Sequence, residues 1–177
     1  PMQQKSRRTE IKAEVPLDAM YKCWHIASRL DKRYYVADLI TDILSGGGST
    51  RLYQSLVKEK KLFSNIECYH FGSHDNGLLT VEGKLVKGVK IDDAEKAVDQ
   101  ELEKIKSHLI SEAELTKVKN KTESTIAFED MSVMNRANSL AYYELLGDAE
   151  LMNQELEKYN AITTEEMRNE ARNIFRE

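Results

Sequence analysis

The sequence predicts an α+β fold in which an antiparallel sheet is backed by helices. Alternating polarity predicts two pairs of strands, residues 7–15 with 19–27 and residues 62–72 with 77–86. The second pair is joined by a segment that contains Asn-Gly, the dipeptide most typical of a tight hairpin. The second half of the chain has helical spacing throughout, so strands do not alternate with helices as they do in a parallel sheet.

Two helices are expected between the strand pairs. The first begins after Asp31, a residue type that favours N-caps, and its apolar residues follow at helical spacing up to Leu44. Gly46-Gly47-Gly48 ends it, because glycine readily adopts the backbone conformations of a tight reversal. The second helix begins near Ser49 and places its apolar residues on one face.

Helix starts in the second half are indicated by capping pairs, in which a short polar residue is followed three positions later by glutamate. Proline is confined to Pro1 and Pro16, so no proline interrupts the helical half. The three expected capping pairs are Asp92 with Glu95, Ser111 with Glu114 and Thr163 with Glu166.

Composition predicts one soluble domain over residues 1–177. Hydrophobic residues make up 41% and charged residues 32% of the chain. The net charge of −4 excludes the basic surface of a typical nucleic-acid binder, and no apolar run reaches the roughly 18 residues of a membrane helix. Cys23 and Cys68 are too few for a disulfide framework, so cytoplasmic and periplasmic locations both stay open.

Residues 43–56 read I-L-S-G-G-G-S-T-R-L-Y-Q-S-L and form the most informative segment. A phosphate-binding P-loop does not fit, because the glycines follow a helix and no lysine precedes Ser49. The segment is similar to the pattern I-L-x-G-G-x-S-S-R-L-(F/Y)-x-x-L of the insulinase-type zinc metallopeptidases, which include pitrilysin, insulin-degrading enzyme and mitochondrial processing peptidase. We expect a structural turn and helix start at Gly46, Gly47, Gly48, Ser49, Thr50 and Arg51.

The resemblance covers roughly residues 8–177 and includes the order of the elements around the motif. It implies the fold of the LuxS and mitochondrial processing peptidase-like metallohydrolases. One homologous unit of that fold is nearly complete here, with the last family strand missing. The chain is therefore expected to be an excised piece of a longer protein.

Active units of this family bind zinc through an H-x-x-E-H motif, whose glutamate activates the attacking water. The histidines of this chain are His25, His70, His74 and His108, and none of them lies in that motif. The chain therefore resembles the family's C-terminal inactive unit, with no catalytic or metal residue and with zinc in the partner half. The Arg and Tyr that many inactive units use to hold substrate are replaced by Val57 and Ser64.

The sequence also has candidate residues for a metal site and for a serine hydrolase. Cys23-x-His25 and Cys68-x-His70 each place a cysteine and a histidine on one face of a strand, so a Cys₂His₂ metal site requires that the two strands be adjacent. Small buried cysteines and half-exposed histidines are the simpler interpretation. A serine hydrolase is not indicated, because no G-x-S-x-G elbow occurs.

The resemblance implies that the chain is the non-catalytic half of a zinc-dependent peptidase, forming the wall of a peptide-enclosing chamber. Its partners would be the active H-x-x-E-H half, on the same or another chain, and a peptide substrate. Nucleic acid and membrane are not expected, and a homodimer stays open. The alternative is a non-enzymatic scaffold, because core subunits of respiratory complexes resemble this fold with degraded sites.

Overall fold

The computed structural model describes residues 5–72 and 74–176. Pro1 and the rest of the first four residues, Ser73 and Glu177 lie outside the described residues, and so do the expectations that fall on them. The described elements, in chain order, are β1 (Ala19–Ile26), α1 (Lys32–Leu44), the π-helical η1 (Tyr53–Glu59), β2 (Phe63–Phe71), β3 (Gly77–Leu85), α2 (Ile91–Ser107), α3 (Glu112–Asp130), α4 (Val133–Leu145), the 3₁₀ helix η2 (Ala149–Gln154), α5 (Glu155–Asn160) and α6 (Thr164–Ile174).

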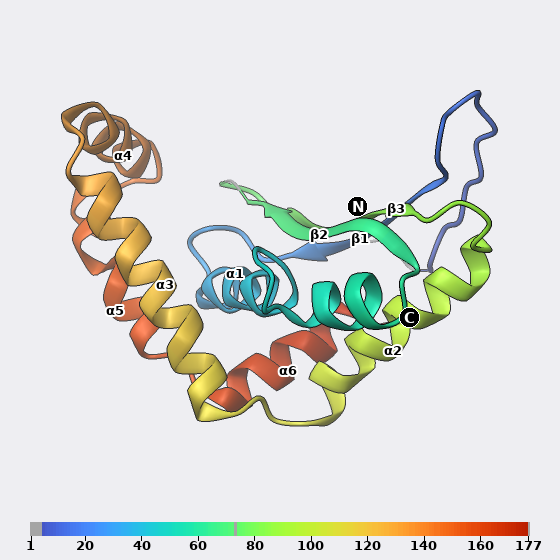
Figure 1. Cartoon of the computed structure of the whole chain (residues 1–177). Coiled ribbons are helices and arrows are strands. Elements are labelled where there is room, and N and C mark those ends of the chain that lie inside the picture. The colour runs from blue at the N-terminus through green and yellow to red at the C-terminus, as the bar shows by residue number, and fades with distance from the viewer. Residues whose placement is uncertain (1–4, 73, 177) are drawn as a thin grey trace.

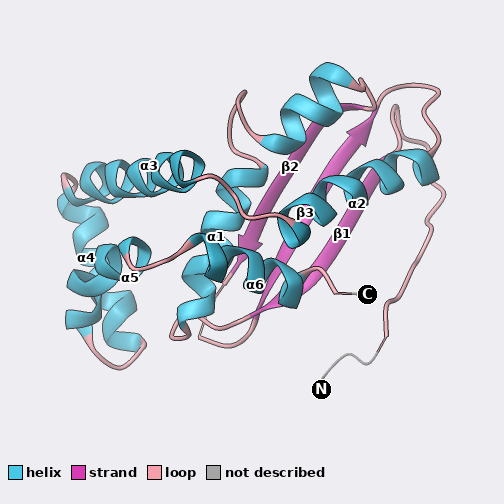
Figure 2. Cartoon of the chain, turned by 90° about the horizontal axis from the view of Figure 1, so that it is seen from below, coloured by secondary structure: helices cyan, strands magenta, loops and turns pink. Residues whose placement is uncertain are grey.

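The three strands form one antiparallel sheet in the order β1-β3-β2. Helices α1, α2 and α6 lie on one side of this sheet, and the opposite side carries no helix in the described part of the chain (Figures 1 and 2). The expected α+β fold, with an antiparallel sheet backed by helices, is therefore confirmed.

The core lies between the sheet and its helices. Each strand alternates, so Met20, Ile66 and Val81 point into this layer and are buried. The central helix α1 packs against both β2 and α6 and contributes fully buried residues such as Leu39 and Ile40. Burial of these apolar side chains is the main force that holds the helices on this face.

Helices α3, α4, η2 and α5 form an arm that extends beyond the sheet (Figure 1). Helix α3 packs against α1, α4 and α5, and α4 packs against η2. Of the 13 residues of α4, all of them described, one is buried, namely Tyr143. No helix in residues 5–72 or 74–176 combines the length and apolarity that crossing a membrane requires.

Two of the sequence predictions are wrong. Residues 7–15 form no strand and are exposed, and Asp92 does not cap α2, which begins at Ile91 after Lys90. Arg8 instead donates to Asp92 Oδ1 at 2.8 Å and to Glu95 Oε2 at 2.6 Å. Both carboxylates therefore pair with Arg8, and neither caps the helix.

Other boundaries follow the predictions. Asp31 caps α1 by accepting from the Arg33 amide, and β2 with β3 forms the expected hairpin. The capping box of Thr163 and Glu166 is complete at the start of α6. Ser111 accepts from the Glu114 amide as a cap, but the Glu114 carboxylate turns away to Arg51.

Candidate functional site

The glycine turn, residues 46–48, reverses the chain between α1 and the following helix. Gly46 has a φ of 101°, in the left-handed region, and a Cβ there would lie 3.0 Å from Lys121 Nζ. The Gly47 carbonyl accepts from the Thr50 amide at 3.2 Å and from Thr50 Oγ1 at 2.7 Å. The Gly48 carbonyl accepts from Gln54 Nε2. These hydrogen bonds hold the turn against the start of the next helix.

Three basic side chains connect this turn and its neighbours to helix α3. The Arg51 guanidinium donates to Glu114 Oε1 at 2.8 Å and to Glu114 Oε2 at 2.6 Å, a two-point ion pair. Lys117 donates to Ser49 Oγ at 2.6 Å. Lys121 donates to Asp42 Oδ1 at 2.6 Å, and burial raises the pKa of that carboxyl while Lys121 opposes the rise. The structural role expected for residues 46–51 stays a prediction.

The candidate Cys₂His₂ metal site is overturned by the strand order. Strand β3 separates β1 from β2, and the Cα partner of Cys23 is Thr80 whereas that of Cys68 is Val81. Neighbouring positions of one strand face opposite sides, so the two cysteines lie on opposite faces of the sheet. In the described residues, no group of three or more His, Cys, Asp or Glu side chains is arranged to hold a metal ion.

The uncovered side of the sheet, here called the open face, carries aromatic and acidic side chains. Glu82 on the central strand accepts from Tyr21 Oη at 3.1 Å and from Tyr69 Oη at 3.0 Å. These hydrogen bonds raise the pKa of both tyrosines, because removing the phenol proton would place two negative charges together. Tyr69 also contacts Phe71, with ring centroids 5.3 Å apart. Tyr21 and Phe71 are 59% and 67% exposed.

A hollow of about 480 Å³ separates the glycine turn from strand β2. Its walls include all three turn glycines on one side and Asn65, Glu67 and Tyr69 on the other. In the described sheet β2 is an edge strand, so it leaves unpaired backbone donors and acceptors beside this hollow. The hollow and the open face therefore share an edge.

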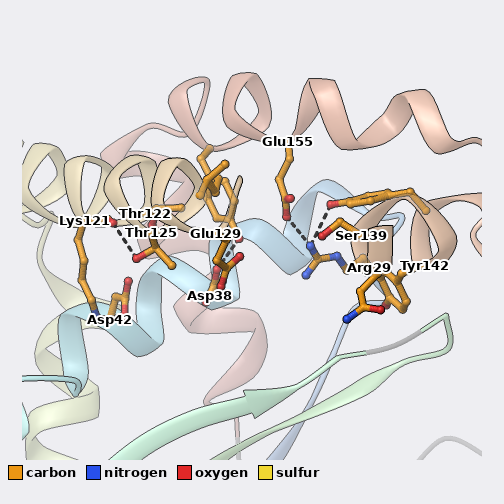
Figure 3. A pocket seen from close by; sticks show the side chains of 14 residues that line it. Arg29, Asp38, Asp42, Lys121, Thr122, Thr125, Glu129, Ser139, Tyr142 and Glu155 are labelled. Atoms are coloured by element: carbon orange, nitrogen blue, oxygen red, sulfur yellow. Dashed lines mark hydrogen bonds and ion pairs between the residues drawn. The ribbon is translucent and has the colours of Figure 1, made fainter. Parts of the chain in front are cut away.

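A second pocket, of about 580 Å³, lies between α1 and the arm, and Figure 3 shows its side chains. Arg29, just after β1, donates to Tyr34 Oη at 2.9 Å, to Tyr143 Oη at 2.9 Å and to Glu155. Burial opposes the charged form of Arg29, but Glu155, Tyr34 and Tyr143 together outweigh burial and raise the pKa of the guanidinium. Arg29 is therefore a cation at neutral pH.

The same network continues across α1 to the sheet. His70 Nε2 lies 2.9 Å from Tyr34 Oη, and His70 Nδ1 lies 3.6 Å from Asp38 Oδ1. Tyr159 donates to the other oxygen of Asp38, and burial with this carboxylate raises the pKa of the phenol. Burial lowers the pKa of His70. These groups are engaged with one another, which suits a structural junction better than a catalytic centre.

No sequence pattern indicates this junction. Arg29 follows a strand as an ordinary turn residue, and its partners Tyr143 and Glu155 lie more than a hundred positions further along. No local spacing encodes such a contact. His74 is exposed and His108 caps the end of α2, so the four histidines are not brought together.

The fold and this chemistry define a class of protein: a helix-backed antiparallel lobe with aromatic side chains on its free face and no metal cluster among its described residues. The family model "Peptidase M16 inactive domain" matches residues 1–122. The chain therefore belongs to the M16 peptidase inactive-domain family.

Relatives agree with this assignment. The uncharacterized zinc protease YmxG of Bacillus subtilis (strain 168) is 24% identical over 147 residues, which cover 82% of this chain and 36% of YmxG. A protease from Helicobacter pylori superposes with a TM-score of 0.86 at 21% identity, covering 93% of this chain and 40% of that one. The inactive peptidase domain of a proposed zinc protease from Bordetella parapertussis gives 0.80 at 20% identity, covering 91% and 86%. The chain thus spans well under half of YmxG and of the H. pylori protease, and the structural likenesses show the fold.

Proposed function

We propose that residues 1–177 act as one unit, the non-catalytic half of a zinc-dependent peptidase, and that the open face forms a wall of the chamber that encloses the peptide. Membership of an inactive-domain family supports the first part. YmxG is named a zinc protease, and this chain matches 36% of it, so a relative of that length has room for a second, zinc-binding unit.

The proposal depends on one observation: in the described part of the chain, helices cover only one side of the sheet (Figure 1). Exposed aromatic rings on a continuous surface mark a place where another molecule binds. Tyr21 and Phe71 supply such rings, with the half-buried Tyr69 ring against Phe71, and the edge of β2 supplies backbone groups that an extended peptide can pair with. A wall of this kind suits peptides with exposed backbone and apolar side chains better than a folded protein.

Zinc and the water-activating glutamate belong, in this proposal, to the other half. The side chains of this chain hold one another: Asp38 is paired with Tyr159 and His70, and Glu155 with Arg29. Their contribution is to keep the wall rigid, which favours productive placement of the peptide.

The test uses the longer protein that contains this chain and a fluorogenic peptide substrate. The double variant Tyr21→Ser with Phe71→Ser should raise KM at least fivefold while bound zinc stays at the wild-type stoichiometry. Leu109→Ser is the matched control, because it removes an exposed apolar side chain away from the open face. An unchanged KM in the double variant would refute the wall, and stoichiometric zinc or peptide cleavage by the 177-residue chain alone would refute the inactive half.

A further inference from the structure

The polar side of helix α4 faces a pocket of the protein, and its apolar side faces solvent. Asn138, Ser139 and Tyr142 face the pocket between the arm and α1, and Figure 3 shows Ser139 and Tyr142 beside Arg29. The opposite side of the helix is apolar, because residues 133, 134, 137, 140, 141 and 145 recur at spacings of three and four. An amphipathic helix of a complete domain buries such a stripe and exposes its polar side, so this one lacks its cover.

Exposed apolar side chains continue from α4 onto the end of α3. We call this set the arm patch. Its members are between 45% and 84% exposed, whereas Leu115, Val118 and Leu146 in the same region are buried. Exposed apolar side chains that lie close together on a soluble protein commonly mark a binding surface. The arm patch consists of Phe128, Met131, Val133, Met134, Leu140 and Leu145.

The arm patch has an acidic surround. The arm with its loops, residues 112–160, contains ten acidic and five basic residues. The whole chain has a net charge of −4, so the rest of it is net basic and the negative charge is concentrated in the arm. Glu129, Asp130 and Glu144 lie within or next to the apolar stripe in the sequence and are exposed.

We propose that the arm patch is the docking surface for the zinc-binding half of the longer protein, through an apolar surface with a basic rim. This rests on the proposed function. Two observations favour this occupant: the chain matches 36% and 40% of two relatives, which leaves length for a second half, and the acidic surround selects a basic partner. A second copy that docked arm to arm would bring like charges together, which opposes association.

The experiment compares amide hydrogen exchange of residues 128–145 in the 177-residue chain and in the full-length protein. Amides of α4 should exchange at least tenfold more slowly in the full-length protein, because docking suppresses the local opening of the helix that exchange requires. The variant Met134→Gln with Leu145→Gln, made in the full-length protein, should restore the faster exchange without changing net charge. Leu109→Gln is the matched control and should leave the exchange of α4 unchanged.

Equal exchange in the two proteins would overturn the proposal, and so would wild-type protection in the double glutamine variant. Protection that appears in the 177-residue chain and rises with its concentration would assign the patch to a second copy and overturn it too. Peptidase activity is measured on the same samples. A full-length protein that cleaves peptide with an unprotected α4 refutes the docking surface alone, whereas one that binds no zinc and cleaves nothing refutes the proposed function.

Discussion

Arg29 and Glu155 form an ion pair although 126 positions separate them in the sequence. Their side chains are 19% and 14% exposed, and the guanidinium also lies 5.0 Å from the Tyr34 ring centroid and 5.6 Å from that of Tyr143. The pair therefore joins the end of β1 to the start of α5, across α1. Because α4 packs against η2, which leads directly into α5, this contact helps to hold the far part of the arm beside α1.

Replacement of Arg29 by methionine should lower the free energy of unfolding by about 2–4 kcal/mol, because it leaves Glu155 charged and partly buried without its partner. Urea denaturation measures the loss. Arg33→Met is the matched control: Arg33 also pairs with a carboxylate, that of Asp31, but the two are 57% and 35% exposed. The control should cost less than about 1 kcal/mol. Equal losses in the two variants would contradict the role of the buried pair.

The elements and their order were predictable from the sequence because the signals are local. The hairpin of β2 and β3, the cap at Asp31 and the capping box at Thr163 each depend on residues a few positions apart. The false strand at residues 7–15 shows the limit of this reasoning. Its alternation is real, but Arg8 finds two carboxylates on α2 and no neighbouring strand pairs with the segment.

The junction around Arg29 was not predictable, since it depends on how far the arm folds back toward α1. The inverted polarity of α4 was equally hidden: its apolar spacing predicts a buried stripe, and the structure exposes that stripe. Periodicity indicates that a helix has an apolar side but not what that side meets. The candidate metal site failed for the same reason, because the strand order alone decides which faces the cysteines occupy.

Gly46→Ala should destabilise the protein by about 1–2 kcal/mol, because the φ of 101° is strained for any residue with a Cβ. The added methyl would also press on Lys121 Nζ at 3.0 Å and disturb its ion pair with Asp42. Thermal unfolding measures the change. Gly47→Ala tests the reason, since its φ is outside the left-handed region and its Cβ would meet nothing within 4 Å. A loss in Gly47→Ala as large as in Gly46→Ala would show that the strain is not the cause.

The ion pair of Arg51 and Glu114 should show a coupling free energy of about 1–2 kcal/mol in a double-mutant cycle. Both side chains are partly buried, and the two parallel bonds resist screening better than a single surface contact does. The cycle uses Arg51→Met, Glu114→Gln and the double variant, with unfolding in urea as the measurement. A coupling close to zero would mean that the glycine turn is held to α3 by packing and the neighbouring lysines rather than by this pair.

His70 should make the folded state less stable in mild acid. Burial lowers its pKa below the usual 6.5, although Asp38 and Asp42 oppose the shift and Arg29 adds to it. A group with a lowered pKa in the folded state binds its proton more readily in the unfolded chain. Its contribution to stability is therefore complete above pH 6.5 and is lost as the pH falls below 6.5 toward the pKa in the folded protein.

The measurement is the free energy of unfolding of wild type and His70→Asn between about pH 8 and about pH 5. The variant should be less stable at pH 8, because it loses the hydrogen bond to Tyr34, but its stability should fall less steeply below pH 6.5. His25→Asn is the matched control, since His25 is exposed on the open face and forms no ion pair with another described residue. Parallel curves for wild type and His70→Asn would show that His70 keeps its ordinary pKa and that the polar junction is more hydrated than its packing implies.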